Sequence, residues 1–456
     1  MGKQTGKINA EILRLAIPSI LANITVPLVG MVDIAVAGHL TVNAATLIGG
    51  ISIGSMLFDL LYWNFGFLRV STGGLTAQAY GKGDRGECAK VLMRSFGLSM
   101  LIAVALIVIQ WLFVQFAFLF VKCTPEVRAL ASKYFFIRIW AAPATLSLMA
   151  LKGWFIGMQD SVSSMTVDLV VNGVNIAASI FLAMGLPGFG RWHGMGFSGI
   201  AAGTVAAQYA GLITALTFVG VKYREVFSGQ RMKDIVSALK ERETRHFMTM
   251  NRDLFIRSVC FIVIYIGYTM ISARYSDILL ASASIMMKLL MIFSYFTDGF
   301  AYAAEAMTGR FIGARDSASL KTTIRYVFVW SISIALLFTA IYWFGGVPML
   351  RAMTSDSIVV DCCRQYLPWL IIMPPLGVIA FTWDGVYIGA TASRQIRNAM
   401  IWSVAAFFIV WFAGMALLRN SDADGGANCI HLLLGAYFAH LVARSIHLTL
   451  KRHSIL

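Results

Sequence analysis

Asp33 is the residue whose type and position most plainly indicate chemistry in this sequence. It lies in residues 24–40, ITVPLVGMVDIAVAGHL, where almost every other side chain is apolar. A charged side chain at membrane depth costs at least about 2.5 kcal/mol, so an ionisable residue there is expected to have a function. Pro27 precedes Asp33 by about two helical turns and is expected to bend the helix. The stretch therefore predicts a movable helix that carries a titratable group.

Charged residues also lie inside apolar stretches of the second half of the chain. These are Asp298, Glu305, Asp384 and Lys288. Asp298 and Glu305 are separated by two helical turns, which places both on one face of a helix. One interpretation is a structural network in which these side chains and Arg257 neutralise one another. The alternative is a site for substrate or for proton relay, and the residues alone leave both open.

Several kinds of chemistry are excluded by missing motifs. The sequence has no G-x-x-x-x-G-K-[ST] loop, which argues against ATP as the energy source. It has neither HExxH nor GxSxG, so an intramembrane hydrolase lacks its usual machinery. The six cysteines show no metal-site spacing and are read as free thiols. We expect no metal and no cofactor.

The composition indicates an integral membrane protein. Of the 456 residues, 58% are hydrophobic and 13% are charged, with a mean hydropathy of +0.74. A soluble core cannot hide so much apolar surface. We predict an all-α polytopic protein, because twelve apolar segments are long enough to span a bilayer. They are 12–38, 44–76, 91–119, 130–157, 164–186, 195–220, 250–272, 276–308, 323–344, 362–390, 398–418 and 429–450.

The net charge of +15 could suggest nucleic acid as a partner. The basic residues, however, lie in short connections between the apolar segments. With the N-terminus in the cytoplasm, the cytoplasmic connections hold far more Lys and Arg than the external ones, as the positive-inside rule requires. This count includes Arg94 and Arg444 among the residues on the cytoplasmic side. We therefore expect no nucleic acid partner and predict that both termini are cytoplasmic.

An internal repeat divides the chain into two six-helix lobes. We predict an N-lobe over residues 1–221, a cytoplasmic linker over 222–249 and a C-lobe over 250–456. An ungapped shift of 232 residues pairs Thr76 with Thr308, Asp84 with Asp316, Tyr134 with Tyr366, Gly153 with Gly385 and Gly157 with Gly389. Because each half crosses the membrane an even number of times, the lobes are related by a pseudo-twofold axis along the membrane normal. This symmetry favours alternating access over a channel.

Four stretches carry a resemblance to a known family. They are WNFGFLRVSTGGLTAQAYG (63–81), LKGWFIGMQDS (151–161), SYFTDGFAYAAEAMTGRFIGA (294–314) and WDGVYIGA (383–390). The chain resembles the multidrug and toxic compound extrusion (MATE) family, in particular its DinF-like branch. The resemblance implies twelve helices in two lobes. It also implies export of organic cations and other amphipathic compounds in exchange for protons or sodium ions.

The resemblance also implies roles for residues of the first lobe. Asp33 matches the family's first-helix aspartate, for which binding of the coupling ion is proposed; the competing interpretation is a permanently neutralised aspartate that holds two helices together. Asn175 matches an asparagine of the fifth helix, and Ser179 stands where many relatives have aspartate. Thr204 corresponds to a polar position of the sixth helix. One carboxylate makes a poorer sodium cage than two, which favours protons.

Lys152 stands where relatives can carry asparagine on the fourth helix, and Asp384 is its counterpart in the repeat. If Lys152 faces the same cleft as Asp33, the two are expected to pair. The alternative is a lysine whose side chain reaches the cytoplasmic edge of the membrane. In some relatives the Asp384 position binds a cation together with a seventh-helix glutamate. The seventh segment here has no glutamate, which speaks against a second ion site.

The residues and the resemblance together predict a proton-coupled exporter of amphipathic or cationic drugs, acting as a monomer in the lipid bilayer. The resemblance implies that this bilayer is the bacterial inner membrane. The alternatives are a sodium-coupled exporter and a flippase for lipid-linked saccharides. A flippase would call for a larger basic cavity, and the acidic candidates argue against it.

Overall fold

The computed structural model describes residues 2–40, 44–121, 123–185, 194–228, 242–272, 277–354, 356–418 and 427–455. Within these ranges the chain forms helices and no strands. Twelve helical segments are long and apolar enough to cross a membrane, which confirms the predicted number. The predicted all-α polytopic fold is therefore confirmed as well.

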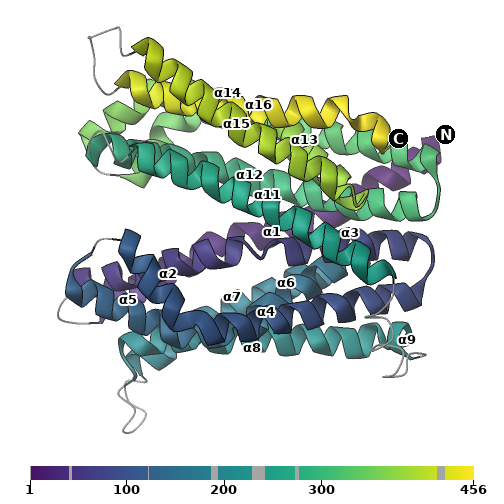
Figure 1. Ribbon diagram of the computed structural model, residues 1–456, viewed down its shortest axis with the longest axis horizontal. Coiled ribbons are helices and arrows are strands. Elements are labelled where there is room, and N and C mark those ends of the chain that lie inside the picture. The colour runs from purple at the N-terminus through teal and green to yellow at the C-terminus, as the bar shows by residue number, and fades with distance from the viewer. Residues whose placement is uncertain are drawn as a thin grey trace. The chain divides into compact units, whose positions relative to one another are not determined.

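The helices follow the apolar segments closely (Figure 1). In the first half they are α1 (Gly2–His39), α2 (Ala44–Trp63), α3 (Phe67–Gly81), α4 (Arg85–Phe120), α5 (Pro125–Arg138), the short 3₁₀ helix η1 (Ile139–Ala141), α6 (Ala142–Gly157), α7 (Ser161–Met184), α8 (Phe197–Lys222) and α9 (Arg224–Phe227). In the second half they are α11 (Arg242–Ser272), α12 (Asp277–Gly313), α13 (Ser317–Met353), α14 (Ser357–Gly389), α15 (Ser393–Leu418), α16 (Ala427–Leu450) and η2 (Arg452–Ser454).

Two predicted spans of the first half are not single helices. The second span divides into α2 and α3 around residues 64–66, and the fourth divides into α5 and α6 through η1. At the first break the side-chain amide of Asn64 donates to the backbone carbonyl of Leu60 (2.8 Å). Gly66 follows, and glycine is unfavourable in the interior of a helix. The corresponding spans of the second half, α12 and α14, are continuous. The repeat is thus regular in topology and irregular in detail.

The repeat is carried by close contacts between backbones. A side chain at Gly153 of α6 would clash with the carbonyl of Arg69 in α3, and a side chain at Gly385 of α14 would clash with the carbonyl of Ala301 in α12. Arg69 and Ala301 are separated by the same 232 residues as the two glycines. Gly157 and Gly389 repeat this arrangement one turn later. Small residues let membrane helices approach closely, so these positions explain why the repeat is visible in the sequence.

The turns at the ends of these helices repeat as well. Gly83 and Arg315 both have positive φ (73° and 57°), and each precedes an aspartate. Those aspartates, Asp84 and Asp316, cap the following helices by accepting hydrogen bonds from the backbone amides three residues on (2.9 and 3.0 Å). An aspartate at this position satisfies one of the free amides of the first helical turn. The same turn chemistry therefore begins α4 and α13.

The described chain forms two compact units. The N-unit comprises residues 21–247, and the C-unit comprises residues 1–20 and 248–456. This division differs from the predicted one at the N-terminus, because the first half of α1 belongs to the C-unit and the second half to the N-unit. Within the C-unit, Arg310 donates to Glu11 (3.0 Å), which ties this part of α1 to α12. Of the predicted linker, residues 229–241 lie outside the described residues.

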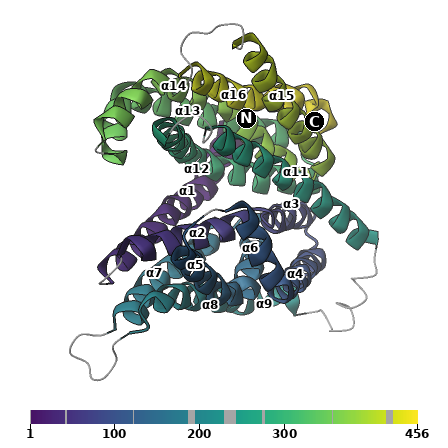
Figure 2. The same cartoon turned by 60° about the vertical axis from the view of Figure 1, so that its left-hand side comes forward.

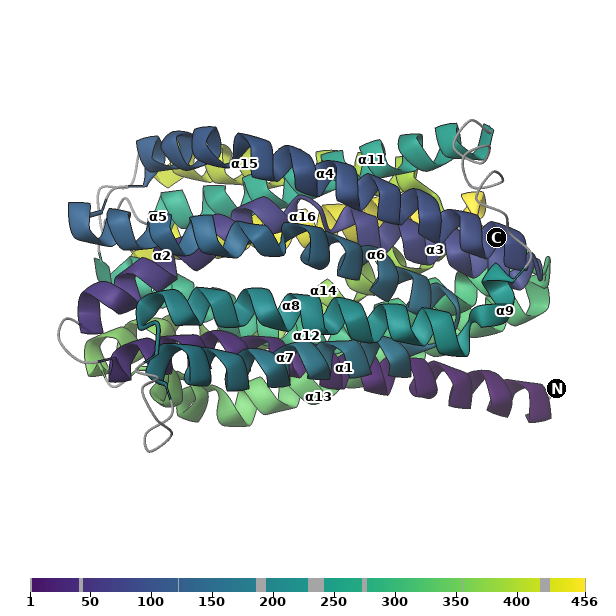
Figure 3. The same cartoon turned by 90° about the horizontal axis from the view of Figure 1, so that it is seen from below.

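Within the N-unit, α7 packs along α8, α3 along α6 and α2 along α5. Figure 3 shows α7 and α8 side by side. The core beneath α9 is aromatic: the indole of Trp154 is fully buried, lies 4.8 Å from the ring of Tyr223 and donates to the carbonyl of Cys88 (2.9 Å). Aromatic pairs of this kind add to the free energy gained from burial alone.

Within the C-unit, α12 packs along α14, and α15 packs along α16 (Figure 2). Tyr268 and Tyr342 lie in the core. The Tyr268 hydroxyl donates a hydrogen bond to the carbonyl of Ala283 (3.2 Å), and the Tyr342 hydroxyl donates one to the carbonyl of Leu289 (2.7 Å). A buried hydroxyl without a partner would cost free energy, so these bonds also position the helices.

Asp160, between α6 and α7, joins three elements of the N-unit. Its carboxylate accepts hydrogen bonds from Ser163, from the Lys222 ammonium (2.6 Å) and from the Tyr223 hydroxyl (2.6 Å). Burial alone would raise the pKa of Asp160, but the hydrogen bonds from these three residues outweigh it and hold this pKa below its usual value. A carboxylate with a lowered pKa stabilises the fold above the pKa it has when unfolded, about 3.9.

We therefore expect Asp160→Asn to lower the free energy of unfolding by about 1–3 kcal/mol at pH 7, because charged hydrogen bonds are lost. Wild-type protein loses the same contribution as the pH falls below about 4 through the lowered pKa of Asp160, so the two proteins should converge there. Thermal unfolding in detergent between pH 3 and 7 measures this. The control is Asp84→Asn, because asparagine caps a helix about as well as aspartate. A stability difference between wild type and Asp160→Asn that did not depend on pH would contradict the lowered pKa of Asp160.

Candidate functional site

Asp33 lies in the part of α1 that belongs to the N-unit, and only 6% of the residue is exposed. The side chain of Ser179 on α7 is a hydrogen-bond partner of its carboxylate. Among the described residues, the carboxylate oxygen Oδ1 of Asp33 is buried without a hydrogen-bond partner. Buried carboxylates normally satisfy both oxygens, so an open oxygen is a place where a proton or a ligand can bind. The side chains of residues 26–29, among them Pro27, are not described, and the bend expected there stays a prediction.

The other polar residues predicted for this site lie together on α7 and α8. Asn175 donates from its amide to the hydroxyl of Thr204 (3.0 Å), and all three of Asn175, Ser179 and Thr204 are buried. Asn175 and Ser179 share one face of α7, as their four-residue spacing predicts. The helices meet closely because Gly203 packs directly on the backbone of Ser179, where an added Cβ would lie 2.6 Å from its nitrogen. The structure thus brings Asp33, Asn175, Ser179 and Thr204 together.

Arg138, at the end of α5, was missed in the sequence. Its guanidinium donates to the hydroxyl of Tyr134 (3.1 Å) and stacks on the ring of Phe58 at 4.8 Å. Its positive charge interacts with both Asp33 and Asp59. Its signal in the sequence is an arginine inside the predicted span 130–157, where a charged side chain is costly. The site is therefore a carboxylate, three neutral polar side chains and a nearby guanidinium.

Lys152 pairs with a different carboxylate from the one expected. Its ammonium lies 2.8 Å from Oδ1 of Asp168 on α7, and both side chains are partly exposed. The pairing with Asp33 that the sequence suggested is therefore wrong. The physical reason is the rotation of α6, which turns Lys152 toward α7. Helix rotation is set by packing and cannot be read from hydropathy.

We expect Lys152→Met to lower the free energy of unfolding by about 1 kcal/mol, since the ion pair is partly exposed, and to leave proton-driven transport intact. Adding Asp168→Leu should recover the lost stability, because the unpaired carboxylate is then removed. Unfolding in detergent and transport in liposomes measure the two effects. Loss of transport in Lys152→Met, with normal stability, would show that this lysine acts on the coupling site after all.

In the C-unit, Asp384 of α14 lies between two arginines. Arg257 of α11 approaches Oδ2 at 2.6 Å, and Arg444 of α16 forms ion pairs with both oxygens, its Nε lying 3.0 Å from Oδ1. Both guanidiniums stack on Phe261 at 4.9 Å. Arg444 is 1% exposed, which corrects its assignment to a cytoplasmic connection. Arg94, assigned in the same way, is also buried and pairs with Glu87 at 2.7 Å.

The remaining residues predicted for the second half are spread around this cluster. Asp298 of α12 interacts electrostatically with Arg444. Glu305, two turns later, is fully buried in α12. Lys288 is exposed and takes no part in the ion pairs of the described residues, so its predicted place in the network is wrong. The network of Asp384, Arg257 and Asp298 agrees with the structural interpretation, with Arg444 in place of Lys288.

The described residues contain no group of three or more His, Cys, Asp or Glu side chains that could hold a metal ion. All six cysteines are free thiols, as the sequence suggested.

Twelve apolar helices in two repeated halves, with ionisable groups buried inside them, define a multi-pass membrane transporter. The chain belongs to the MATE family: the family model MatE matches residues 18–181 and 254–416. The two matched segments correspond to the two halves of the repeat. The family is one of transporters and not of enzymes.

Known proteins resemble the chain over most of its length. DNA damage-inducible protein F of Escherichia coli K12 is 33% identical over 410 residues, covering 88% of this chain and 86% of that protein. A probable multidrug resistance protein NorM of Photorhabdus laumondii is 24% identical over 419 residues, covering 89% and 86%. These values confirm the DinF-like branch.

Solved structures share the fold. A transporter of the MOP superfamily from Pyrococcus furiosus superposes with a TM-score of 0.84 at 16% identity, covering 98% of this chain and 96% of that one. A variant of a MATE transporter from Vibrio cholerae superposes with a TM-score of 0.80 at 15% identity, covering 99% and 98%.

Proposed function

We propose that this protein exports amphipathic organic cations or other small toxic compounds in exchange for protons by alternating access. The observation that carries the proposal is Asp33, a buried carboxylate beside Ser179 whose Oδ1 has no hydrogen-bond partner among the described residues. Protonation of that oxygen would remove a charge from the interior, and loss of the proton would restore it. A ligand that binds two conformations unequally shifts their populations, so a proton at Asp33 can drive a change of conformation.

One feature favours protons over sodium ions. A sodium ion requires several oxygen ligands around it, whereas this site offers a single carboxylate, Asp33, with the neutral side chains of Ser179, Asn175 and Thr204 around it. A proton needs only one oxygen atom and forms a covalent bond with it.

The substrate class is inferred from relatives. NorM of Photorhabdus laumondii is named a probable multidrug resistance protein, and MdtK of Klebsiella pneumoniae is named a multidrug resistance protein. The many aromatic residues and 23 methionines of this chain suit adaptable binding of flat hydrophobic compounds.

We propose further that the protein lies in the inner membrane as a monomer with both termini in the cytoplasm. That orientation follows from the excess of Lys and Arg, which persists after Arg94 and Arg444 are removed from the count.

Flux measurements with purified protein in liposomes test this proposal. A fluorescent organic cation is followed under a pH gradient without sodium, and then under a sodium gradient without a pH gradient. We expect export with the pH gradient alone, accompanied by proton movement in the opposite direction. Export that needed sodium and ignored the pH gradient would reverse the assignment of the ion. Protein-free liposomes give the background rate.

A further inference from the structure

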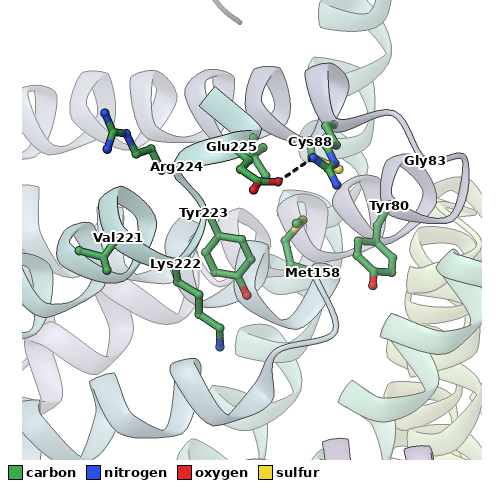
Figure 4. A pocket seen from close by; sticks show the side chains of 11 residues that line it. Tyr80, Gly83, Cys88, Met158, Val221, Lys222, Tyr223, Arg224 and Glu225 are labelled. Atoms are coloured by element: carbon green, nitrogen blue, oxygen red, sulfur yellow. Dashed lines mark hydrogen bonds and ion pairs between the residues drawn. The ribbon is translucent and has the colours of Figure 1, made fainter. Parts of the chain in front are cut away.

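A cavity of about 530 Å³ opens at one end of the N-unit (Figure 4). Asp33 is not among its lining residues. Its walls come from the turn between α3 and α4, the end of α6, and the junction of α8 with α9. The lining includes Tyr80, Arg85, Met158, Lys222, Tyr223 and Glu225. Neither the transport proposal nor the polar site around Asp33 uses any of these residues.

The cavity lies where four membrane-spanning segments end. Tyr80 is next to the last residue of one span, Arg85 begins another, Met158 follows the end of a third, and Lys222 ends a fourth. A helix needs about 20 residues to cross the hydrocarbon core, and these four spans have 26 to 36 residues, so their ends reach at least the lipid headgroups. Tyr80 is 40% exposed, and tyrosines are frequent at the headgroup level. We therefore expect the opening at or just beyond the lipid phosphates.

Three basic side chains line the cavity against one acidic side chain. Arg85, Lys222 and Arg224 are the basic residues, and Glu225 is the acidic one. The Lys222 ammonium is already paired with the Asp160 carboxylate (2.6 Å), so Arg85 and Arg224 are the two guanidiniums left for a ligand. The dashed line in Figure 4 marks the ion pair between Glu225 and Arg85, at 3.0 Å. The side chain of Arg85 is 69% exposed and that of Glu225 is 82% exposed. Ion pairs that are this exposed contribute little to stability. An incoming phosphate could therefore take over the Arg85 guanidinium at small cost.

The inner wall is held in place by buried contacts. Lys222 and Tyr223 both bind the Asp160 carboxylate, and the ring of Tyr223 packs on Trp154 (4.8 Å between ring centres). These contacts fix Tyr223 and the Lys222 ammonium on the inner side of the cavity, while Arg85 and Glu225 at its mouth are exposed.

We infer that this cavity binds the phosphate headgroup of an anionic phospholipid. Val221, on the lining, is 77% exposed, and an apolar side chain beside three basic ones suits a ligand with both a phosphate and an acyl chain. A soluble phosphate would gain nothing from it. Basic pockets between spanning helices are known to recognise such headgroups. Bound lipid would link α4, α6 and α8 at one membrane surface.

Native mass spectrometry of purified protein titrated with phosphatidylglycerol and phosphatidylcholine tests this inference. We expect tighter binding of phosphatidylglycerol, weakened about fivefold by Arg85→Gln and about fivefold by Arg224→Gln, the effect of one basic residue near a lipid surface. Glu225→Gln should strengthen binding, because the competing carboxylate is removed. The matched control is Lys321→Gln, an exposed basic residue at the start of α13, which should leave binding unchanged.

Three results would overturn the inference. One is equal binding of the two lipids by wild-type protein. Another is a loss in Lys321→Gln as large as in Arg85→Gln, which would indicate general surface charge. The third is displacement of phosphatidylglycerol by millimolar inorganic phosphate, which would make the site one for a free anion. Thermal unfolding of each variant without lipid separates weakened binding from misfolding.

Discussion

Asp33→Asn is expected to reduce proton-driven export strongly while leaving the protein folded. Asparagine has nearly the same shape as aspartate and can still accept a hydrogen bond from Ser179, but it cannot take up a proton. A ligand shifts a conformational equilibrium only by its unequal affinity for the two states. Without a proton that binds at residue 33, the proton gradient therefore cannot shift the equilibrium between the two conformations. The coupling free energies seen in proteins correspond to about 5–150-fold, and we expect a loss of export in that range.

Paired flux measurements in liposomes check this result. Outward movement of the fluorescent cation and inward movement of protons should fall together in Asp33→Asn. The control is Glu126→Gln, which removes an exposed carboxylate at the start of α5 and should transport normally. Binding of the cation to detergent-solubilised Asp33→Asn should persist. Coupled export at the wild-type rate by Asp33→Asn would remove the central claim of the proposed function.

Asp384→Asn is expected to produce a large loss of stability in the C-unit. The carboxylate is the shared partner of Arg257 and Arg444, and the latter is almost fully buried. Removing one partner of a buried ion pair leaves an uncompensated charge and costs about 3–5 kcal/mol. Unfolding in detergent, followed by the near-ultraviolet signal of the aromatic residues, measures this loss.

A double-mutant cycle identifies the cause. Combining Asp384→Asn with Arg444→Met should recover part of the stability, because the uncompensated guanidinium is removed as well. Lys288→Met serves as the control, since Lys288 is exposed and lies outside the ion pairs described. An Asp384→Asn protein as stable as wild type, but unable to transport, would instead place Asp384 in the transport pathway.

The sequence by itself was sufficient for the spans and for the repeat. Helices that cross a bilayer must satisfy every backbone group internally and must face lipid with apolar side chains, so hydropathy locates them directly. The repeat was visible through residues such as Gly153 and Gly385, because only glycine tolerates the backbone contacts made there. The shared face of Asn175 and Ser179 also followed from local helical geometry. These features depend on one helix or on one backbone contact at a time.

Only the tertiary structure decided which charges meet. Lys152 binds Asp168 instead of Asp33, Arg444 is buried against Asp384, and Arg138 lies near Asp33. The rotation of each helix selects these partners, and that rotation depends on packing against neighbours far away in the sequence. A count of charges near span ends cannot tell a basic residue in a connection from one turned into the protein. The division of α1 between two units has the same origin, since a continuous apolar helix carries no mark of where its neighbours change.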